Sequence, residues 1–309
     1  MLRCVLSDIN GLEIVAPAAL TLNIDVDEGV PADSLYAVFP YFEAAEFMGI
    51  RVYSGDDIVF AGVVDEEERI YHPSGKTLRI SARSLAAHLL DNEAAPCSYD
   101  HPSARLICER YVLPYGITVG DGDDSVYLGE QSVMKGSSCW NVLKNFCSAC
   151  YSSIPRISGE GVLYLKGMKK DESVRFGGSD GIRYIEMSEK YKRCEEISAV
   201  NIKTLSLGGY RLPIENTDAI GRGIVRERYL NAVMTEIPMK RAEAMIRSGA
   251  EKAYTMKLRC PSRLLGIEGY RALVENVAEN TNDLYISALR YRMNRSGEYT
   301  DIVMKRRMS

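Results

Sequence analysis

The stretch TLRISARSLAAHLLDN, residues 77–92, changes its hydrophobic period from two to about 3.6 within a few residues. Its first half alternates apolar and polar residues, as a strand does, and from Leu85 onward the apolar residues fall on one helical face. Arg83 stands at the join, in the turn Ser-Ala-Arg-Ser, where an enzyme would often place glycines or a nucleophile. The sequence therefore predicts a strand that runs directly into a short amphipathic helix, with Ser84 as the N-cap and no catalytic residue at the turn.

Length and composition predict a folded globular protein. A chain of 309 residues is expected to form two or three domains, and 46% hydrophobic with 26% charged residues is close to the globular average. The longest apolar runs stay well below the roughly 18 residues that a membrane-spanning helix needs. Asp8 and Asn10 interrupt the N-terminus before a signal-like apolar core can form. We therefore expect no membrane insertion and no cleaved export signal.

Eight cysteines are scattered without the spacing of a disulfide framework, which predicts reduced cytosolic thiols. The pair in CSAC, Cys147 and Cys150, could form a redox pair or half of a zinc site. No second CxxC or paired histidine completes a metal site, and the pair lies late in a helical pattern rather than at a helix N-terminus, which would favour the thiolate. Six residues recur at helical spacing on one face, which instead favours the cysteines as buried small hydrophobic side chains: Cys139, Val142, Leu143, Phe146, Cys147 and Cys150.

The two halves of the chain differ in charge. Residues 1–150 carry 10 Lys/Arg against 22 Asp/Glu, and residues 151–309 carry 28 against 20, so the net charges are −12 and +8. This asymmetry suits one half docking against the other in an assembly, or a chance division of solvated faces. The basic residues are dispersed, which makes nucleic-acid binding the weaker interpretation.

Short alternating segments bounded by Gly, Pro and Asp dominate residues 1–84, a pattern typical of an antiparallel sheet or barrel. The residues GDD at 55–57 predict a hairpin between IRVYS and IVFAGVV, because Gly and Asp tolerate the backbone dihedrals of tight turns. Residues 31–49, PADSLYAVFPYFEAAEFMG, read as a long inserted arm in which Pro40 interrupts an apolar run and Gly49 closes a short helical piece.

Residues 85–151 show helical periodicity. The second helix has Asp100 as a possible cap and an apolar face formed by Ala104, Ile107, Cys108 and Tyr111. The third begins at Ser137 or Ser138 and carries the only tryptophan, Trp140, which we interpret as a core anchor. A hairpin then turns through Gly159 and Gly161.

From about residue 183 the alternation returns, apart from one helix in MKRAEAMIRSGAEKAY. The predicted class is α+β, with two antiparallel barrel-like domains that flank a small α/β insert. We expect domain boundaries at 1–86, 87–182 and 183–309.

No catalytic, metal or cofactor site is predicted. His72, His88 and His101 stand in no metal or nucleophile motif and are interpreted as structural. The run DGDD at 121–124 lacks the glutamate that completes a calcium loop, so a solvated turn is favoured. The run DEEER at 65–69 is expected to form a wet edge that discourages strand addition.

The ordered signature of residues 58–94, 101–117 and 132–165 resembles the baseplate hub family of contractile phage tails, phage-tail-like bacteriocins and injection systems, of the late control protein D type. In that family a strand ends in an xGRD-like turn before a short helix with a leucine pair, and a later helix ends in a PxGI element. The turn SARS at 81–84 keeps the arginine and departs at the glycine and the acid. The other matching residues are Leu89, Leu90, Asp91, Pro114, Gly116 and Ile117.

The resemblance implies a structural protein rather than an enzyme. It implies two tail-tube-like β-barrel domains per chain and a homotrimer that forms a pseudo-six-fold ring, joining the hexameric tail tube to the trimeric spike protein. Further implied partners are a tape measure or LysM-type tail protein, with DNA only as passing cargo. The implied location is the bacterial cytoplasm during assembly and then the baseplate of the tail or tail-like particle. An acidic half that lines the lumen would repel passing DNA.

The arm at residues 31–49 is richer in aromatic residues than a solvent loop. We predict an intersubunit contact there, with local core packing as the alternative. The residues concerned are Tyr36, Phe39, Tyr41, Phe42 and Phe47.

Two other functions stay open at this point. The chain could be a distal tail protein of a non-contractile phage, since such proteins also use tube-like barrels. It could also be a tail-associated peptidoglycan hydrolase, although no segment is left over for a lytic domain.

Overall fold

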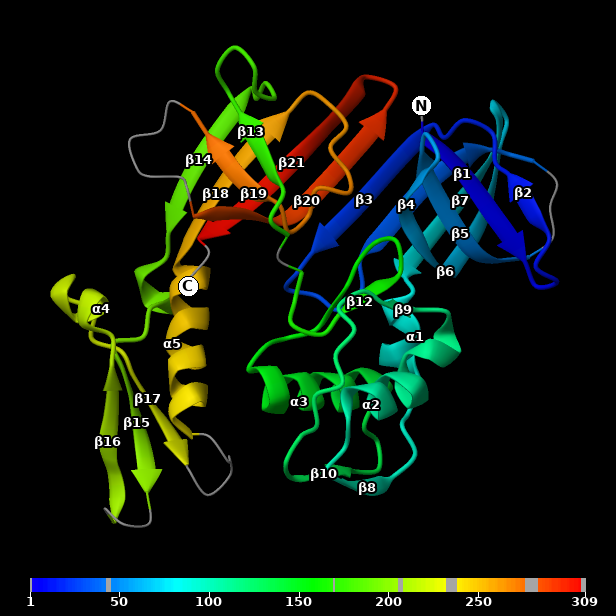
Figure 1. Ribbon diagram of the computed structural model, residues 1–309. Coiled ribbons are helices and arrows are strands. Elements are labelled where there is room, and N and C mark those ends of the chain that lie inside the picture. Colours follow the sequence, from blue (N-terminus) through cyan, green and yellow to red (C-terminus); the bar gives the residue numbers. More distant parts are fainter. Residues whose placement is uncertain are drawn as a thin grey trace. The chain divides into compact units, whose positions relative to one another are not determined.

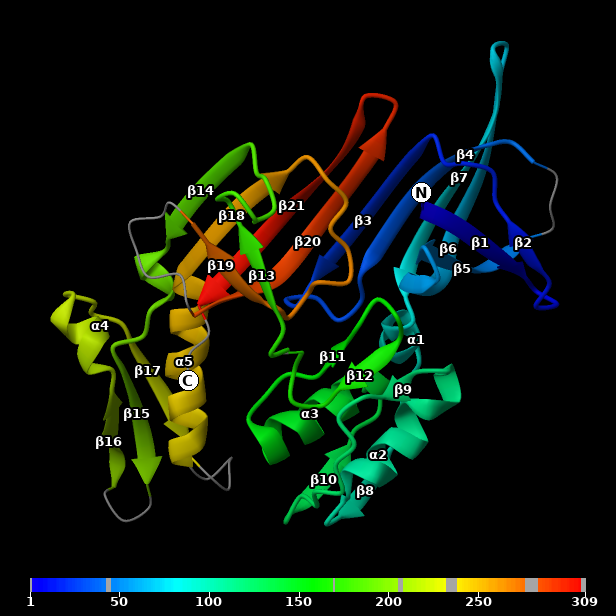
Figure 2. The same ribbon diagram turned by 45° about the horizontal axis from the view of Figure 1, so that its top comes forward.

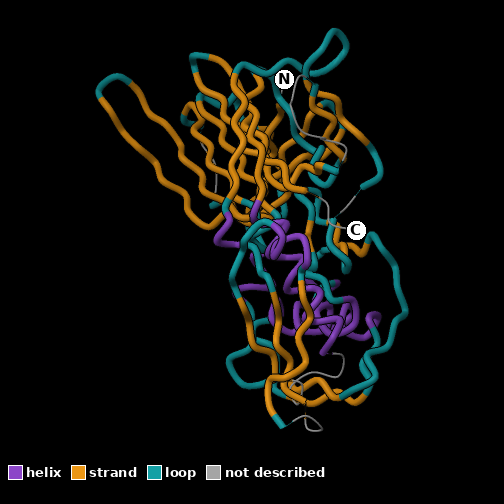
Figure 3. Tube along the Cα trace, turned by 90° about the vertical axis from the view of Figure 1, so that its left-hand side faces the viewer, coloured by secondary structure: helices purple, strands orange, loops and turns teal. Residues whose placement is uncertain are grey.

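A computed structural model describes residues 2–42, 46–168, 170–204, 208–231, 238–275 and 283–306. Strands, mostly antiparallel, make up much more of the described chain than helices do (Figure 3), which confirms the α+β class. The chain forms two compact units. The first comprises residues 1–169, 260–268 and 288–301, and the second comprises residues 170–259, 269–287 and 302–309.

The first unit contains a large antiparallel sheet (Figure 1). Its strands in spatial order are β2 (Glu13–Val15), β1 (Leu2–Asp8), β5 (Phe47–Ser54), β6 (Asp57–His72), β7 (Gly75–Ser84), β4 (Ser34–Pro40), β3 (Thr21–Asp27) and the later part of β20 (Leu284–Asn294). The pairing of β3 with β20 joins Leu22 to Met293 and Asp27 to Ala288. Residues from both ends of the sequence therefore share one sheet.

Alternation of side chains explains why these segments form strands. In β3 the buried residues are Leu22, Ile24 and Val26, and in β4 they include Leu35 and Phe39. Successive side chains of a strand point to opposite faces, so each strand places one apolar set in the core and one polar set outside. The turn predicted at GDD is also present, because Gly55 adopts φ 68° between β5 and β6.

The predicted arm at residues 31–49 is wrong in its local structure. Residues Ser34–Pro40 form β4, which pairs with β3 and β7. Gly49 ends no helix and lies within β5, opposite Ser7 and Val63. Residues 43–45 lie outside the described residues. The sequence pattern did not predict this strand, because it contains Pro40 and an aromatic run and because its partner β7 lies far away in the sequence.

The hairpin of β6 and β7 is the longest in the unit. Pairing of β6 with β5 ends at Val63, whereas pairing with β7 continues to His72 opposite Gly75, with a bulge between Val64 and Glu66. On the other side, β4 pairs with β7 as far as Thr77, so only the tip of the hairpin projects beyond both neighbouring strands (Figure 2). A two-stranded projection offers both of its faces to a partner.

The described strand pairings of this unit form an open path from β2 through β20 to β21 (Gly297–Arg306), whose residues 297–301 belong to this unit. None of the described pairings joins β2 back to β20, so the expected closed barrel is not observed in the described part of the unit. The ends of an open sheet carry unpaired backbone groups.

The segment after β7 forms the predicted α/β insert, which has a hydrophobic core of its own. Its elements are α1 (Ala86–Asp91), β8 (Cys97–Asp100), α2 (Ala104–Tyr111), η1 (Leu113–Tyr115), β9 (Thr118–Val119), β10 (Glu130–Val133), α3 (Cys139–Tyr151), β11 (Arg156–Ile157) and β12 (Val162–Tyr164). The separate core supports the middle domain as a folding unit. The boundaries 1–86, 87–182 and 183–309 stay a prediction.

The helices of the insert follow the sequence pattern closely. All four residues predicted on the apolar face of α2 are buried, and Trp140 is buried in α3. The N-cap of α3 is Ser138, as predicted, whose Oγ accepts a hydrogen bond from the Asn141 N–H at 3.2 Å. The cap of α2 is Ser103 rather than Asp100, because Asp100 lies in β8.

The second unit contains several smaller sets of strands. Its elements are β13 (Ser173–Phe176), β14 (Glu186–Tyr191), η2 (Arg193–Glu195), β15 (Ala199–Thr204), β16 (Gly209–Glu215), α4 (Thr217–Gly221), β17 (Glu227–Asn231), α5 (Pro238–Ala253), β18 (Tyr254–Cys260), β19 (Arg271–Val274) and the end of β21 (Gly297–Arg306). Strand β14 pairs antiparallel with β18, and β13 pairs parallel with β19. A sheet in the order β16-β15-β17 stands apart and packs against α5.

Gly62 is a sensitive point of the strand arrangement, and it yields a first prediction. A methyl group at Gly62 would collide with the Arg83 carbonyl oxygen and would lie 2.7 Å from the Phe60 ring. The Gly62→Ala variant should therefore lose about 1–3 kcal/mol of unfolding free energy, measured by urea denaturation. Gly122→Ala is the control, since nothing lies within 4 Å of its added methyl group. Equal denaturation midpoints for the two variants would contradict the predicted collision.

Candidate assembly surface

Arg83 lies where the strand β7 meets the helix α1, and it makes two ion pairs there. Its Nε and Nη2 donate to the Asp65 carboxylate on β6 at 2.7 and 2.8 Å. Its Nη1 and Nη2 donate to the Asp91 carboxylate at the end of α1, at 3.1 and 2.7 Å. Bidentate contacts of this kind fix geometry because the guanidinium is planar. The arginine therefore fastens the last residue of the helix to the sheet, and it lowers the pKa of Asp91 by hydrogen bonding.

Ser84, the next residue, faces the interior. Its Oγ accepts a hydrogen bond from the Asp33 N–H at 3.0 Å, and its own N–H donates to the Asp33 carbonyl oxygen at 2.8 Å. The prediction that Ser84 caps α1 is wrong, since Leu85 occupies the N-cap position without a side-chain hydrogen bond. The buried hydroxyl is used instead to hold the loop between β3 and β4.

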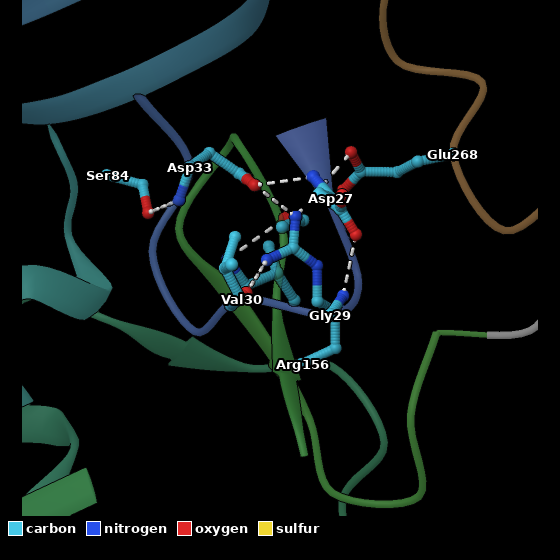
Figure 4. A network of polar contacts seen from close by, with 9 residues as sticks. Asp27, Gly29, Val30, Asp33, Ser84, Arg156 and Glu268 are labelled. Atoms are coloured by element: carbon cyan, nitrogen blue, oxygen red, sulfur yellow. Dashed lines mark hydrogen bonds and ion pairs between the residues drawn. The ribbon is translucent and has the colours of Figure 1, made fainter. Parts of the chain in front are cut away.

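Asp33 receives a buried guanidinium from the insert (Figure 4). Arg156, the first residue of β11, places Nη2 at 2.5 Å from Asp33 Oδ1 and donates from Nη1 to the Val30 carbonyl oxygen at 3.2 Å. The Glu268 carboxylate lies 4.0 Å from the same nitrogen. The side chain of Asp33 is fully buried, and that of Arg156 is only 5% exposed. Three segments far apart in the sequence therefore meet at one cation.

Burial makes this joint depend on both partners. It raises the pKa of the Asp33 carboxyl, and the Arg156 charge opposes that shift. Asp33 Oδ2 is buried and has no hydrogen-bond partner among the described residues. A buried carboxylate in this setting is tolerated only while its cation stays in place. The joint is a structural element and contains no nucleophile.

Four of the five predicted interface residues lie on adjoining ring contacts. Phe42 meets Phe39 at a centroid distance of 6.3 Å and Phe47 at 5.8 Å. Phe39 and Phe47 are buried within the chain, and Phe42 is half-buried. For the two buried rings the geometry favours the core-packing alternative.

Tyr41 extends this aromatic cluster to the base of the projecting hairpin tip. Its ring lies 6.1 Å from that of Tyr71, and the Lys76 ammonium lies 5.4 Å from Tyr41 and 5.2 Å from Tyr71. A cation between two aromatic faces is attracted to both. Tyr71 is 61% exposed, so the hairpin carries an aromatic surface that is held in place by the chain itself.

Tyr36 lies apart from the other four predicted residues. It is three residues from Phe39 in β4, and because side chains alternate along a strand, the two point to opposite faces of the sheet. The contact role predicted for Tyr36, Tyr41 and Phe42, which are all partly exposed, stays a prediction. Tyr71 was missed because a single tyrosine beside a charged run gives no sequence signal.

The acidic run at 65–69 is bound by specific partners. Asp65 binds Arg83, and Glu68 accepts a hydrogen bond from Arg79 at 3.1 Å. The Glu67 carboxylate accepts from the Phe47 N–H at 3.1 Å. The acidic run therefore helps to orient the hairpin, and its charged side chains also expose a polar edge to solvent.

Two of the three histidines and Asp121 of the acidic loop make contacts within the protein, and the structural role predicted for the histidines stays a prediction. His88 stacks on Tyr115 at 5.4 Å, and His101 contacts Asp100 at 2.6 Å. Asp121 accepts hydrogen bonds from the Leu165 and Lys166 N–H groups. Within the described ranges no group of three or more His, Cys, Asp or Glu residues could hold a metal ion. No described helix has the length and apolarity needed to cross a membrane.

The two thiols of the CSAC pair, Cys147 and Cys150, both have raised pKa values. Cys147 is fully buried in α3, and burial raises the pKa of its thiol. Burial also raises the pKa of Cys150 to about 11. Neither thiol favours the thiolate that redox chemistry or zinc binding requires. The predicted packing role of Cys147 is confirmed.

Comparison with solved structures finds this fold in phage tail proteins. A 43 kDa tail protein of prophage MuSo2 from Shewanella oneidensis matches with a TM-score of 0.80 at 15% identity, covering 99% of this chain and 98% of that one. A tail protein from Neisseria meningitidis MC58 matches with a TM-score of 0.76, also at 15% identity, covering 99% and 96%. No protein-family model matches the sequence, and neither does any curated protein.

The fold also occurs in secretion-system proteins. An E. coli component of the type VI secretion system, described as structurally similar to the T4 bacteriophage tail proteins gp27 and gp5, matches with a TM-score of 0.60 at 10% identity. That match covers 100% of this chain and 77% of the other. The structural neighbours are thus phage tail proteins and type VI secretion proteins, as the sequence resemblance led us to expect.

The buried joint generates a second prediction. Arg156→Ala should cost roughly 3–5 kcal/mol of unfolding free energy, because it leaves the Asp33 carboxylate buried without its cation. Asp33→Asn and Arg156→Met are also made singly and together, and the double variant should lose less unfolding free energy than the sum of these two single losses, measured by chemical denaturation. Arg105→Ala, which breaks the exposed pair with Glu109, is the control and should leave stability unchanged. Additive losses would show that the two side chains do not act together.

The outer ion pair generates a third prediction, on pH. Because the folded-state pKa of Asp91 is lowered, its contribution to stability is present above the unfolded pKa of about 3.9 and is lost as the pH falls below it. NMR titration should therefore find the Asp91 carboxyl pKa below about 3.9. The Arg83→Gln variant should bring it back toward that value. An unchanged Asp91 titration in the variant would refute the assigned cause.

Proposed function

We propose that this chain is a structural baseplate hub of a contractile tail or a tail-like particle. The observation that carries the proposal is the end-to-end match to phage tail proteins, with 99% of this chain and 98% of the Shewanella oneidensis protein aligned. A shared fold over whole chains supports a shared architectural role more than a match to one domain would. The match to a type VI secretion component with gp27-like and gp5-like structure extends this support to the region where tube and spike meet.

In the proposed assembly three chains form a pseudo-six-fold ring that joins the hexameric tail tube to the trimeric spike. The domains 1–86 and 183–309 would each supply a tube-like part, closed by strands of neighbouring chains. The short edge strand β2 supports this, because Leu12 just before it and Val15 at its end are 62% and 61% exposed. Apolar side chains on an open sheet edge are stabilised by a neighbouring subunit.

The aromatic surface of the β6–β7 hairpin is the proposed intersubunit contact. Tyr71 and Tyr41 are preordered by Lys76, so little conformational entropy would be lost on association. Tyrosine is also among the residues enriched at the centres of interfaces. Tyr36 and Phe42 would contribute from opposite faces of the sheet.

The remaining partners follow from the same proposal. The ring would contact the tail tube protein on one side and the spike protein on the other, with a tape measure or LysM-type tail protein nearby. DNA would pass through without a specific site. The protein would reside in the bacterial cytoplasm during assembly and in the particle afterwards. It would have no catalytic activity and no cofactor.

The fourth prediction tests assembly. Light scattering coupled to gel filtration should give 34.4 kDa or about 103 kDa for the chain alone, the masses of monomer and trimer. Mixing with the adjacent spike protein should produce a species with three copies of each chain. Tyr71→Arg should weaken that assembly at least about tenfold, since it places a charge in the contact.

The control for this prediction is Val225→Arg, which changes a side chain that is 91% exposed in the second unit. It should assemble as the unmodified chain does. A chain that stays monomeric with the spike, or an equal loss in both variants, would contradict the proposed contact. Digestion of purified peptidoglycan by the chain would contradict the structural role.

A further inference from the structure

The small sheet of the second unit has one covered face and one open face. Val200 and Ile202 of β15 are buried, and Leu212, Ile214 and Leu230 pack with them beside α5 (Figure 1). Because side chains alternate, the residues between them point to the other face. The described residues that form the core with α5 all lie on the first face, and they leave this second face uncovered.

Strand register places a defined set of residues on the open face. Asn201 lies opposite Pro213 on β16 and Tyr229 on β17. Lys203 lies opposite Tyr210, across a bulge that follows Ile202. The next row joins Glu215 and Glu227 across Ala199. The open face therefore combines two aromatic rings with amide, ammonium and carboxylate groups.

The two tyrosines form an exposed aromatic pair over the central strand. Their ring centroids are 5.3 Å apart at an interplanar angle of 83°. Tyr210 is 43% and Tyr229 63% exposed, although burying such rings is favourable. The Lys203 ammonium lies over the Tyr210 ring, 5.9 Å from its centroid, and this contact helps to hold the ring in its orientation.

Hydrogen bonds hold the polar groups beside these rings. Glu227 Oε2 accepts from Asn201 Nδ2 at 2.9 Å and from the Tyr229 hydroxyl at 3.3 Å. These contacts fix the Tyr229 side chain while most of its ring surface stays open. A preordered ring with nearby donors and acceptors reduces the entropy cost of binding a ligand.

The charge of the face restricts the ligand class. One ammonium, Lys203, stands against two carboxylates, Glu215 and Glu227, so a phosphate backbone would be repelled rather than bound. A purely apolar ligand would leave the amide and carboxylate groups without partners as it excluded water. A neutral molecule with apolar C–H faces and many hydroxyl groups satisfies both requirements.

We propose that the open face of the β16-β15-β17 sheet binds a neutral oligosaccharide of β-1,4-linked pyranose rings with the gluco configuration. In such a chain the ring substituents are equatorial, so the axial C–H groups form flat apolar faces that stack on tyrosine. The hydroxyl groups at the ring edges then meet Asn201, Lys203 and Glu227. This site lies in the second unit and does not depend on the proposed hub function.

The experiment uses the full chain and two defined probes. Calorimetric titration with tetra-N-acetylchitotetraose and with cellotetraose should give a dissociation constant on the order of 0.1–1 mM for at least one of them, as suits an open and shallow site. Tyr229→Ala should weaken this binding at least about tenfold, because it removes the more exposed ring. Tyr229→Phe keeps the ring and should retain most of the affinity.

Tyr191→Ala is the control, since it removes a tyrosine that is 36% exposed from β14, outside this sheet. It should bind the probe as the unmodified chain does, and circular dichroism should show each variant folded. The absence of binding by both probes would overturn the proposal. So would an equal loss in Tyr191→Ala, or tighter binding of an oligothymidylate than of either sugar.

Discussion

The buried ion pair between Asp33 and Arg156 is the constraint on which the first unit depends. Removing two charges from water costs several kcal/mol each, so the pair persists only where geometry and further hydrogen bonds offset that cost. The Asp27 N–H donates to the Asp33 carboxylate, and the Val30 carbonyl accepts from Arg156. Ser84, at the end of β7, holds the Asp33 backbone. The same strand end thus carries one clamp inside the protein and one outside, since Arg83 holds Asp65 and Asp91 on the other face. The strand–helix turn needs no glycine because none of its residues adopts a positive φ.

Local features of the fold could be predicted from the sequence, whereas distant pairings could not. The buried faces of α2 and α3 followed from helical spacing, because that signal lies within a few residues. The joint of Asp33 with Arg156 spans 123 positions, and neither residue stands in a motif. Ser84 was misassigned for the same reason, since its partner arrives from the β3–β4 loop. The strand at Ser34–Pro40 was hidden because its stability comes from neighbours on both sides.

The candidate surface shows what an aromatic-rich sequence can and cannot indicate. Clustering of aromatic residues located a real assembly of rings, but it did not tell buried rings from exposed ones. Phe39 became part of the core, while Tyr71, outside the predicted set, became the exposed member. Strand alternation decides that outcome, and it separates Tyr36 from Phe39 despite their closeness in sequence. Function in a structural protein therefore depends on which face each residue occupies.

The pairing of β3 with β20 has a consequence for synthesis on the ribosome. The partner of β3 emerges about 260 residues later, which at about 5–20 residues per second is a delay on the order of 10–50 s. During that interval the free edge of β3 can pair with another nascent chain. Cellular yield would then be limited by how well chaperones shield this edge, more than by the stability of the finished protein.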